Sequence, residues 1–403
     1  MIQSQRARHW SLLSVVWVGM IVLVNPLGNF PLMDDWAYTV PVLNLLNRGA
    51  LQLSNWGAPN LFSHVMWGAL FAKLFGFSFT VLRFSTLCLG LISIISFYEI
   101  FRELKLPPRM GVHAALVLAG SPLFLLLSNT YMSDVSYCAF GLLACLFLIK
   151  SLRRDSTRYN LLGLFFACVA LLTRQVGLAL FIGYACALLV KGPTKRGLIS
   201  FFGILVLGIA VQKGYEAIML SYGWLPVAFN SQSIAFSTAL AGAPLDTLKV
   251  AVKNGTAFFL YLGLFTFPLQ LLHALRFVER LPAKRIAQVT GIFCLFFVGF
   301  MFYLVQNDLK LPLLPNLISR VGFGPLTLRD AVFFRSEIIY SLPETFWWSV
   351  TGTGAAGGFL LAAFFFAAAK RLIDRFYFWQ NLRKNTSLVF LVVTLMVSFA
   401  PRI

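Results

Sequence analysis

Long apolar segments recur along this chain and constrain its fold more than any other feature. A helix that crosses a bilayer needs about 20 mostly apolar residues. Charged residues make up only 12% of the 403 residues, about half of their share in a soluble domain and too little for a polar surface. We therefore predict an all-α polytopic membrane protein, a single transmembrane domain over residues 1–403 with about eleven spanning helices. The predicted spans are residues 10–27, 80–100, 111–128, 135–149, 159–173, 175–190, 197–213, 252–273, 288–306, 345–369 and 386–400.

Three segments need a closer interpretation. The first span follows Arg6 and Arg8, as the apolar part of a secretory signal would, but no cleavage pattern of small residues follows it. We therefore predict an uncleaved membrane helix. Residues 60–77 are apolar yet carry a His and a Lys, which favours a helix that lies at the membrane interface. The stretch 159–190 fits either two spans or one kinked unit, because only three polar residues interrupt it.

The basic residues indicate how the chain is oriented. A net charge of +19 by itself is typical of nucleic-acid binding, but 21 of the 33 Lys and Arg fall in the six short segments on one side of the predicted spans. Short cytoplasmic loops are enriched in Lys and Arg. We therefore predict a cytoplasmic N-terminus, a multi-pass protein of the plasma (inner) membrane and no nucleic-acid partner.

The opposite side of the predicted membrane carries the long connections. Its loops 28–79, 214–251 and 307–344 contain 38 to 52 residues each, whereas ordinary connections have about 4–6. We therefore expect the functional surface on the periplasmic or extracellular face, with interface helices in the first of these loops.

Three carboxylates belong to this outer face in the predicted topology. Asp34 and Asp35 begin the first outer loop, and Asp134 lies in the short turn before the fourth span. Each could simply cap a helix. Carboxylates held close together also suit a general base, or a hard divalent ion such as Mg or Mn held by Asp35 and Asp134. From spacing alone, capping and catalysis remain alternatives.

Cations also reach this face. Arg174 interrupts two apolar segments, where an Arg usually faces protein or a water-filled cavity, and its planar guanidinium suits a phosphate. A side chain that extends to the interface is the alternative. Arg320 and Arg329 lie in the last outer loop and could bind a lipid phosphate, or form a solvated basic surface.

These features occur in an order that resembles the GT-C membrane glycosyltransferases. In particular, the chain resembles the family that includes the protein O-mannosyltransferases and the aminoarabinose lipid A transferase. It covers roughly residues 10–190, and its specificity rests on the order of short motifs in a shared topology. The motifs are Asp34-Asp35, Leu74-Phe75-Gly76-Phe77-Ser78, Leu82-Arg83-Phe84-Ser85, Ser133-Asp134 and Thr173-Arg174-Gln175.

The resemblance implies a function. The donor would be a sugar on a polyprenyl phosphate, and the acceptor a lipid, glycan or protein at the outer face. Asp34 or Asp35 would act as base or orient the acceptor, and cations such as Arg174 would stabilise the leaving phosphate. A single displacement would invert the anomeric centre. The predicted catalytic residues are Asp34, Asp35 and Asp134, and the predicted substrate-binding residues are Arg174, Tyr38, His64, Tyr131, Arg320 and Arg329.

Two departures and two alternatives stand beside this hypothesis. Some relatives place a Lys before a proline in the first loop, where Ala58 precedes Pro59 here. Many relatives also continue further, so the chain is expected to be a short or truncated member.

A transporter or flippase for an amphipathic or lipid-linked substrate is the main alternative, although no internal repeat is visible. A membrane scaffold without chemistry is the other.

Overall fold

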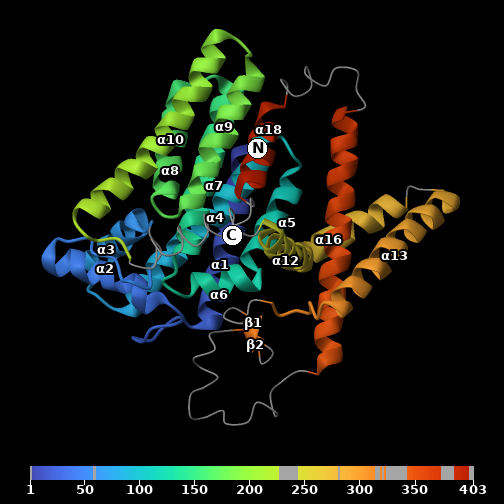
Figure 1. The fold of residues 1–403 in the computed structure, drawn as a ribbon, viewed down its shortest axis with the longest axis horizontal. Coiled ribbons are helices and arrows are strands. Elements are labelled where there is room, and N and C mark those ends of the chain that lie inside the picture. The colour runs from blue at the N-terminus through green and yellow to red at the C-terminus, as the bar shows by residue number, and fades with distance from the viewer. Residues whose placement is uncertain are drawn as a thin grey trace. The chain divides into compact units, whose positions relative to one another are not determined.

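The protein is helical along most of the chain that the structure describes (Figure 1). The computed structural model describes residues 2–57, 60–226, 244–279, 282–313, 318–319, 322–323, 343–373 and 385–398. The α-helices are α1 (Ile2–Val24), α2 (Asp35–Arg48), α3 (Phe62–Phe75), α4 (Phe79–Glu103), α5 (Pro108–Ala119), α6 (Pro122–Ser128), α7 (Ser133–Arg154), α8 (Thr157–Leu171), α9 (Leu178–Lys191), α10 (Lys195–Ser221), α12 (Pro244–Val278), α13 (Ala283–Gln306), α16 (Glu344–Ile373) and α18 (Thr386–Ser398). A short 3-10 helix, η1 (Gln175–Gly177), and the antiparallel pair β1 (Ile318–Ser319) and β2 (Gly322–Phe323) complete the described elements.

Each of the eleven predicted spans coincides with one of these helices or, for residues 111–128, with a broken pair. Six described helices are long and apolar enough to cross a membrane, or seven if the broken pair α5–α6 counts as one span. Helices α8, α9 and α18 are apolar but shorter. The count of about eleven spans and the orientation of the chain therefore stay predictions.

Two helix boundaries differ from the sequence prediction for local reasons. The predicted span 111–128 bends by 62° between α5 and α6, because Pro122 has no N–H to continue the α5 hydrogen-bond ladder. Helix α10 continues to Ser221, eight residues beyond the predicted 213. There Lys213 and Glu216 form an ion pair of 2.7 Å along the helix, which lets the helix extend past its apolar part.

The chain divides into two compact units. The first contains α1 to α5, most of α6, α7 to α10, and α18. Its core forms where α1, α4, α7, α8 and α9 pack together, and Trp17 lies at its centre with 1% of its surface exposed. The Trp17 indole donates a hydrogen bond to the carbonyl of Leu87 in α4. Burial of this aromatic ring fixes α1 against α4, since a buried indole N–H needs a partner.

The second unit contains α12, α13, α16 and the β1–β2 pair. Its core includes Leu260, Leu304 and Trp347, one from each of the three helices. Helices α12 and α16 approach closely, because a Cβ at Gly263 would collide with the backbone of Gly354. Small residues such as these glycines let two helix backbones approach closely. The single transmembrane domain over residues 1–403 therefore stays a prediction.

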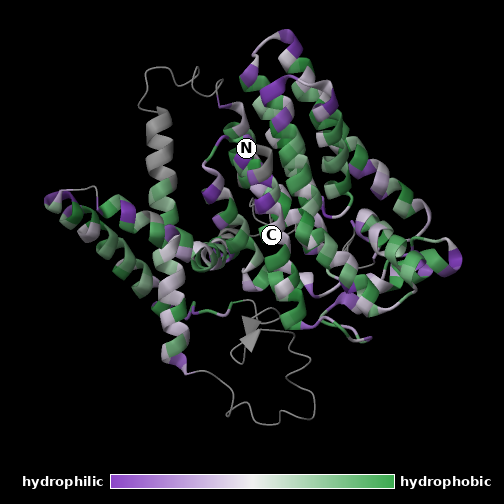
Figure 2. Cartoon of the chain, turned by 180° about the vertical axis from the view of Figure 1, so that it is seen from behind, coloured by the Kyte–Doolittle hydropathy of each residue, from purple (hydrophilic) through white to green (hydrophobic). Residues whose placement is uncertain are grey.

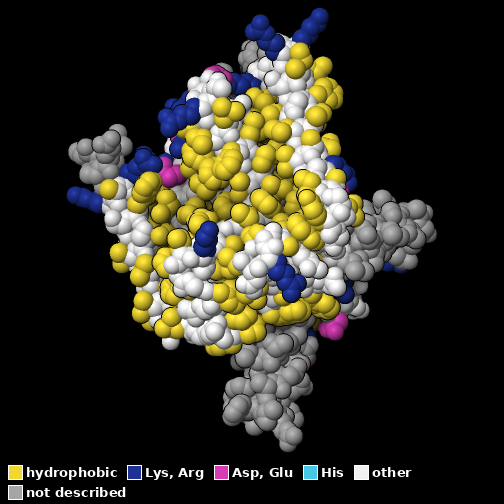
Figure 3. All heavy atoms as spheres, turned by 90° about the vertical axis from the view of Figure 1, so that its left-hand side faces the viewer, with side chains coloured by type: hydrophobic (Ala, Val, Ile, Leu, Met, Phe, Trp, Pro, Cys, Tyr) yellow, Lys and Arg dark blue, Asp and Glu magenta, His cyan; other side chains and the backbone are white. Residues whose placement is uncertain are grey.

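Apolar side chains also cover much of the outside of the helices. Along α10, the exposed large residues include Ile199, Phe202, Val206 and Ile209. Hydrophobic residues run along the long helices, while hydrophilic ones gather near many of their ends (Figure 2). One face of the molecule is dominated by hydrophobic side chains, with Lys and Arg at its upper edge (Figure 3). Exposed apolar surface of this extent is typical of contact with lipid, as expected for a multi-pass membrane protein.

Candidate functional site

The first outer loop folds into α2 and α3, and it separates the two adjacent carboxylates. Asp34 is the exposed N-cap of α2, and its side chain makes no capping hydrogen bond. Asp35 is the first residue of the helix and is fully buried. Its Oδ1 accepts a hydrogen bond of 2.6 Å from the backbone N–H of Leu32. Its Oδ2 is buried and has no hydrogen-bond partner within the described parts of the chain. The structure therefore gives these neighbours different environments, and only Asp35 has a buried, unsatisfied oxygen.

Burial also changes the acidity of Asp35. Desolvation raises the pKa of its carboxyl from 3.8 to about 6. The backbone amides of Leu32 and Tyr131 and the charge of Arg83 oppose this rise. The amide of Tyr131 belongs to the turn before α7, so the Asp35 carboxyl approaches the segment that leads into α7, whose first turn contains Asp134. A carboxyl with a pKa near 6 can take up and release a proton close to neutral pH.

Arg83 of α4 holds the segment that leads into Asp35. Its guanidinium is buried and donates to the carbonyls of Pro26, Gly28 and Phe30, with the Gly28 contact at 2.9 Å. It also lies over the ring of Phe30, 4.9 Å from its centroid. Three carbonyls bound by one planar fork fix the path of residues 26–30. Arg83 therefore positions the loop from which Asp35 enters α2.

His64 of α3 lies in an aromatic pocket. Its ring stacks on Tyr131 at a centroid distance of 4.1 Å and meets the edge of Tyr38 at 6.0 Å. Its Nδ1 lies 2.8 Å from the hydroxyl of Ser136, and its backbone carbonyl accepts a hydrogen bond from the Tyr131 hydroxyl. Burial lowers the pKa of His64 to about 3, so the imidazole is neutral at physiological pH. Its buried Nε2 has no partner among the described residues.

Arg174 and Asp134 meet at the break between α8 and α9. Arg174 donates from Nη1 to Asp134 Oδ1 at 2.6 Å and from Nε to the Ser133 hydroxyl at 3.0 Å. Their side chains are 21% and 33% exposed, so the pair remains accessible to a ligand. Asp134 lies in the first turn of α7 without acting as its N-cap, which is Met132. The charge of Arg174 also opposes the rise that burial causes in the pKa of Tyr38.

A further hydrogen-bond network holds this break in place. Asn60, just before α3, donates to the carbonyl of Leu171 at the end of α8 and to Gln212 of α10 at 2.7 Å. Both side chains are buried. The first outer loop is thus tied to α10 and to the end of α8, three residues before Arg174. The 159–190 stretch forms two helices, α8 and α9, joined by η1.

The described side chains do not offer a cage for a divalent ion. Within the part of the chain that the structure describes, no group of three or more His, Cys, Asp and Glu side chains could hold a metal. Asp134 is already paired with Arg174, and hard cations prefer six or more oxygen ligands. The divalent ion at Asp35 and Asp134 therefore stays a prediction.

The structure brings together most of the predicted site. Contacts or electrostatic interactions connect the catalytic and substrate-binding candidates of the first half of the chain, with the exception of the exposed Asp34. Arg320 and Arg329 lie outside the described residues. The connected candidates are Asp35, Asp134, Arg174, Tyr38, His64 and Tyr131.

One segment of the chain matches a known protein family. Residues 61–213 match the family described as dolichyl-phosphate-mannose-protein mannosyltransferase. This segment is a GT-C family domain. The GT-C domain runs from α3 through most of α10 and contains His64, Asp134 and Arg174. It covers less than half of the chain, and Asp34 and Asp35 precede it. No curated protein was found that matches the chain.

The GT-C domain and the apolar helices indicate a multi-pass membrane glycosyltransferase. The resemblance noted in the sequence is therefore confirmed for this segment. In the sequence, Arg83 is visible only as part of a motif, and no pattern predicts a role for Ser136 or Asn60. For Arg83 a signal existed, since an Arg near the start of an apolar helix needs buried partners. Ser136 carries no comparable signal, because small polar residues are common in membrane helices, and neither does Asn60, a polar residue in a predicted outer loop.

Proposed function

We propose that the protein transfers a sugar from a polyprenyl-phosphate donor to an acceptor hydroxyl at the outer face of the plasma membrane. Two features support the proposal: the GT-C domain over residues 61–213, and the buried Asp35 carboxyl with its unpartnered oxygen. The family implies a lipid-linked sugar donor and association with the membrane. The acceptor is a lipid, a glycan or a protein.

Asp35 has the properties of a general base for this reaction. With a pKa of about 6 its carboxyl is mostly ionised at pH 7 yet basic enough to accept a proton. The Oδ2 atom is the oxygen that can take the proton of the acceptor hydroxyl. The acceptor oxygen then forms a bond to the anomeric carbon as the bond from that carbon to the phosphate oxygen breaks. The attack comes from the face opposite the phosphate, so the anomeric configuration inverts.

Arg174 compensates charge on the leaving group in this proposal. Phosphate leaves with its electron pair and gains negative charge, which a fixed guanidinium stabilises. Ser133 and Asp134 bind the Nε and Nη1 atoms of Arg174, and its side chain is exposed enough, at 21%, to meet a phosphate. We therefore assign Asp134 a positioning role toward Arg174, beside its predicted catalytic role. Tyr38 interacts with Arg174 and contacts the ring of the neutral His64.

The experiment compares two adjacent carboxylates. The encoding gene is deleted in its own organism and complemented with wild type, Asp35→Asn or the matched control Asp34→Asn. Glycolipids and glycans are then profiled by mass spectrometry. We expect deletion to remove at least one glycosylated species, Asp34→Asn to restore it, and Asp35→Asn not to restore it despite equal amounts of protein in the membrane.

Other outcomes would change the proposal. An identical profile for wild type and Asp35→Asn would exclude Asp35 as the base. An unchanged set of glycan products together with loss of substrate movement across the membrane would instead support the transporter or flippase alternative. An unaltered profile on deletion, with no envelope phenotype, would leave a scaffold as the better interpretation.

A further inference from the structure

A basic pocket lies where one end of α1, of α4 and of α7 come together. The sequence predicts that these helix ends are cytoplasmic. Its volume is about 380 Å³, within the range of about 300–1,000 Å³ that is usual for small-molecule sites. Five cations and two carboxylates contribute to its lining, which leaves a formal charge of +3. The lining residues are Arg6, Glu99, Arg102, Glu103, Lys105, Lys150, Arg154 and Tyr159.

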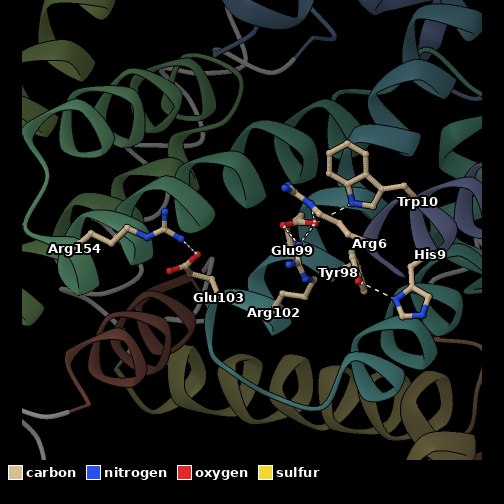
Figure 4. Close-up of polar contacts among 8 residues, drawn as sticks. All are labelled: Arg6, His9, Trp10, Tyr98, Glu99, Arg102, Glu103 and Arg154. Atoms are coloured by element: carbon tan, nitrogen blue, oxygen red, sulfur yellow. Dashed lines mark hydrogen bonds and ion pairs between the residues drawn. The ribbon is translucent and has the colours of Figure 1, made fainter. Parts of the chain in front are cut away.

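Two carboxylates, the buried Glu99 and the partly buried Glu103, pre-arrange the arginines of this pocket (Figure 4). Glu99 accepts hydrogen bonds from Arg6 at 2.9 Å and from Arg102 at 3.0 Å, and its side chain is only 8% exposed. It also accepts one from the indole of Trp10, over which Arg6 lies at 4.6 Å. Glu103 binds Arg154 in the same way at 2.6 Å. Side chains from three different helices are therefore held together, rather than scattered in solvent.

The two lysines differ from the arginines. Neither Lys105 nor Lys150 has a carboxylate within ion-pair distance among the described residues. Lys150 lies over the rings of Phe147 and Tyr159, at 5.3 Å and 5.6 Å from their centroids. These contacts orient its ammonium without neutralising it. The pocket thus combines paired arginines with two uncompensated ammonium groups.

We propose that this pocket binds a phosphate-bearing anion. Guanidinium and ammonium groups that converge with excess positive charge match a phosphomonoester or diphosphate. Basic residues at cytoplasmic helix ends act as orientation signals in membrane proteins generally, but they do not need a cavity or buried carboxylates to do so. Two sources share this chemistry, the headgroup of an anionic lipid and a soluble phosphate. The proposal is independent of the transferase reaction.

The test measures binding by the full-length purified protein with two probes. Inorganic pyrophosphate is titrated by calorimetry into protein in phosphatidylcholine nanodiscs. Phosphatidic acid is compared with phosphatidylcholine of the same acyl chains by native mass spectrometry. The pocket variant is Lys105→Gln with Lys150→Gln. The matched control is Arg109→Gln with Arg158→Gln, two exposed cations of neighbouring predicted cytoplasmic segments that do not line the pocket.

We expect wild type and the control to bind alike and the pocket variant to bind about 10- to 30-fold more weakly. Pyrophosphate binding identifies a soluble ligand, and preference for phosphatidic acid identifies a lipid headgroup. The proposal is overturned if wild type binds neither probe above the phosphatidylcholine background, or if the control loses as much affinity as the pocket variant. Thermal unfolding of each variant separates loss of binding from loss of fold. If the pocket variant is unfolded, the titration of the wild type with the two probes still decides the proposal.

Discussion

The guanidinium of Arg174 lies 2.6 Å from the carboxylate of Asp134, although 40 residues separate them in the chain. This pair joins the break between α8 and α9 to the first turn of α7. Because both side chains are partly exposed, the pair contributes only about 0.2–1 kcal/mol to stability. In the proposed reaction this pair orients Arg174 toward the leaving phosphate.

Substitution of this pair should therefore change transfer far more than stability. We expect Arg174→Gln to lower product formation by a factor on the order of 100, and Asp134→Asn to lower it less, because the cation remains. The double variant should be no worse than Arg174→Gln, as expected for residues that act together. Product quantification and thermal unfolding on the same four proteins check this. Equal loss of activity and stability would indicate a structural pair only.

Transfer should depend on pH through Asp35. Burial raises the pKa of this carboxyl to about 6, and only the ionised form can act as base. Activity should therefore fall below pH 6, by about tenfold per pH unit, and reach a plateau above pH 7. Initial rates in isolated membranes between pH 4.5 and 8 measure this profile. The variant His64→Gln is the control, because neutral His64 does not titrate in this range, and its acidic limb should coincide with that of wild type.

Acid stability should show two opposing titrations. The pKa of Asp35 is raised on folding, so its contribution to stability is present below pH 3.8 and is lost as pH rises to about 6. The pKa of His64 is lowered to about 3, so its contribution is present above pH 6.5 and is lost as pH falls toward 3. Between pH 3.8 and 6 the two slopes cancel. We expect Asp35→Asn to lose about 1.4 kcal/mol more per pH unit of acidification than wild type in this window.

Thermal unfolding at pH 4, 5 and 6 tests this cancellation. His64→Gln should show the opposite trend and gain stability on acidification across the same window. The double variant should again be nearly flat. Parallel curves for wild type and both single variants would contradict the assigned titrations.

Gly68 in α3 leaves room for the Tyr131 hydroxyl. A Cβ at this position would collide with that hydroxyl, which donates to the His64 carbonyl at 3.0 Å. Gly68→Ala should therefore displace the ring that stacks on His64, with a loss of about 1–3 kcal/mol and lower product formation. Gly141→Ala in α7 is the matched control, since nothing lies within 4 Å of its added Cβ. Similar unfolding temperatures for the two variants would exclude the predicted collision.

Arg83 should not tolerate replacement by lysine. A single ammonium group lacks the planar fork that binds the carbonyls of Pro26, Gly28 and Phe30. We expect Arg83→Lys to lose about 1–3 kcal/mol and to expose residues 26–33 to limited proteolysis. The exposed Arg48→Lys, in α2, serves as the control. A protected loop in Arg83→Lys would show that the charge alone is sufficient.

Hydropathy along the chain was sufficient to predict the helical elements. Predicted spans such as 80–100 and 135–149 coincide with a described helix, and 111–128 coincides with the broken pair α5–α6, because apolar side chains and internal backbone hydrogen bonding are properties of the local segment. The acidic residues, Arg174 and the resemblance to GT-C transferases were also visible in short motifs. Boundaries at Pro122 and Ser221 were missed, since a bend and a polar helix end depend on what surrounds them.

The helical class of fold and the motifs follow from the sequence alone, and so does the predicted excess of basic residues on one side of the membrane. Only the tertiary structure distinguished Asp35 from Asp34, because burial depends on packing by segments remote in the chain. The same holds for His64, whose partner Ser136 is 72 residues away, and for Arg83, which reaches Phe30 across 53 residues. Desolvation and hydrogen bonding act through space. They decide which of several similar side chains acquires an altered pKa, and local patterns of sequence do not contain that information.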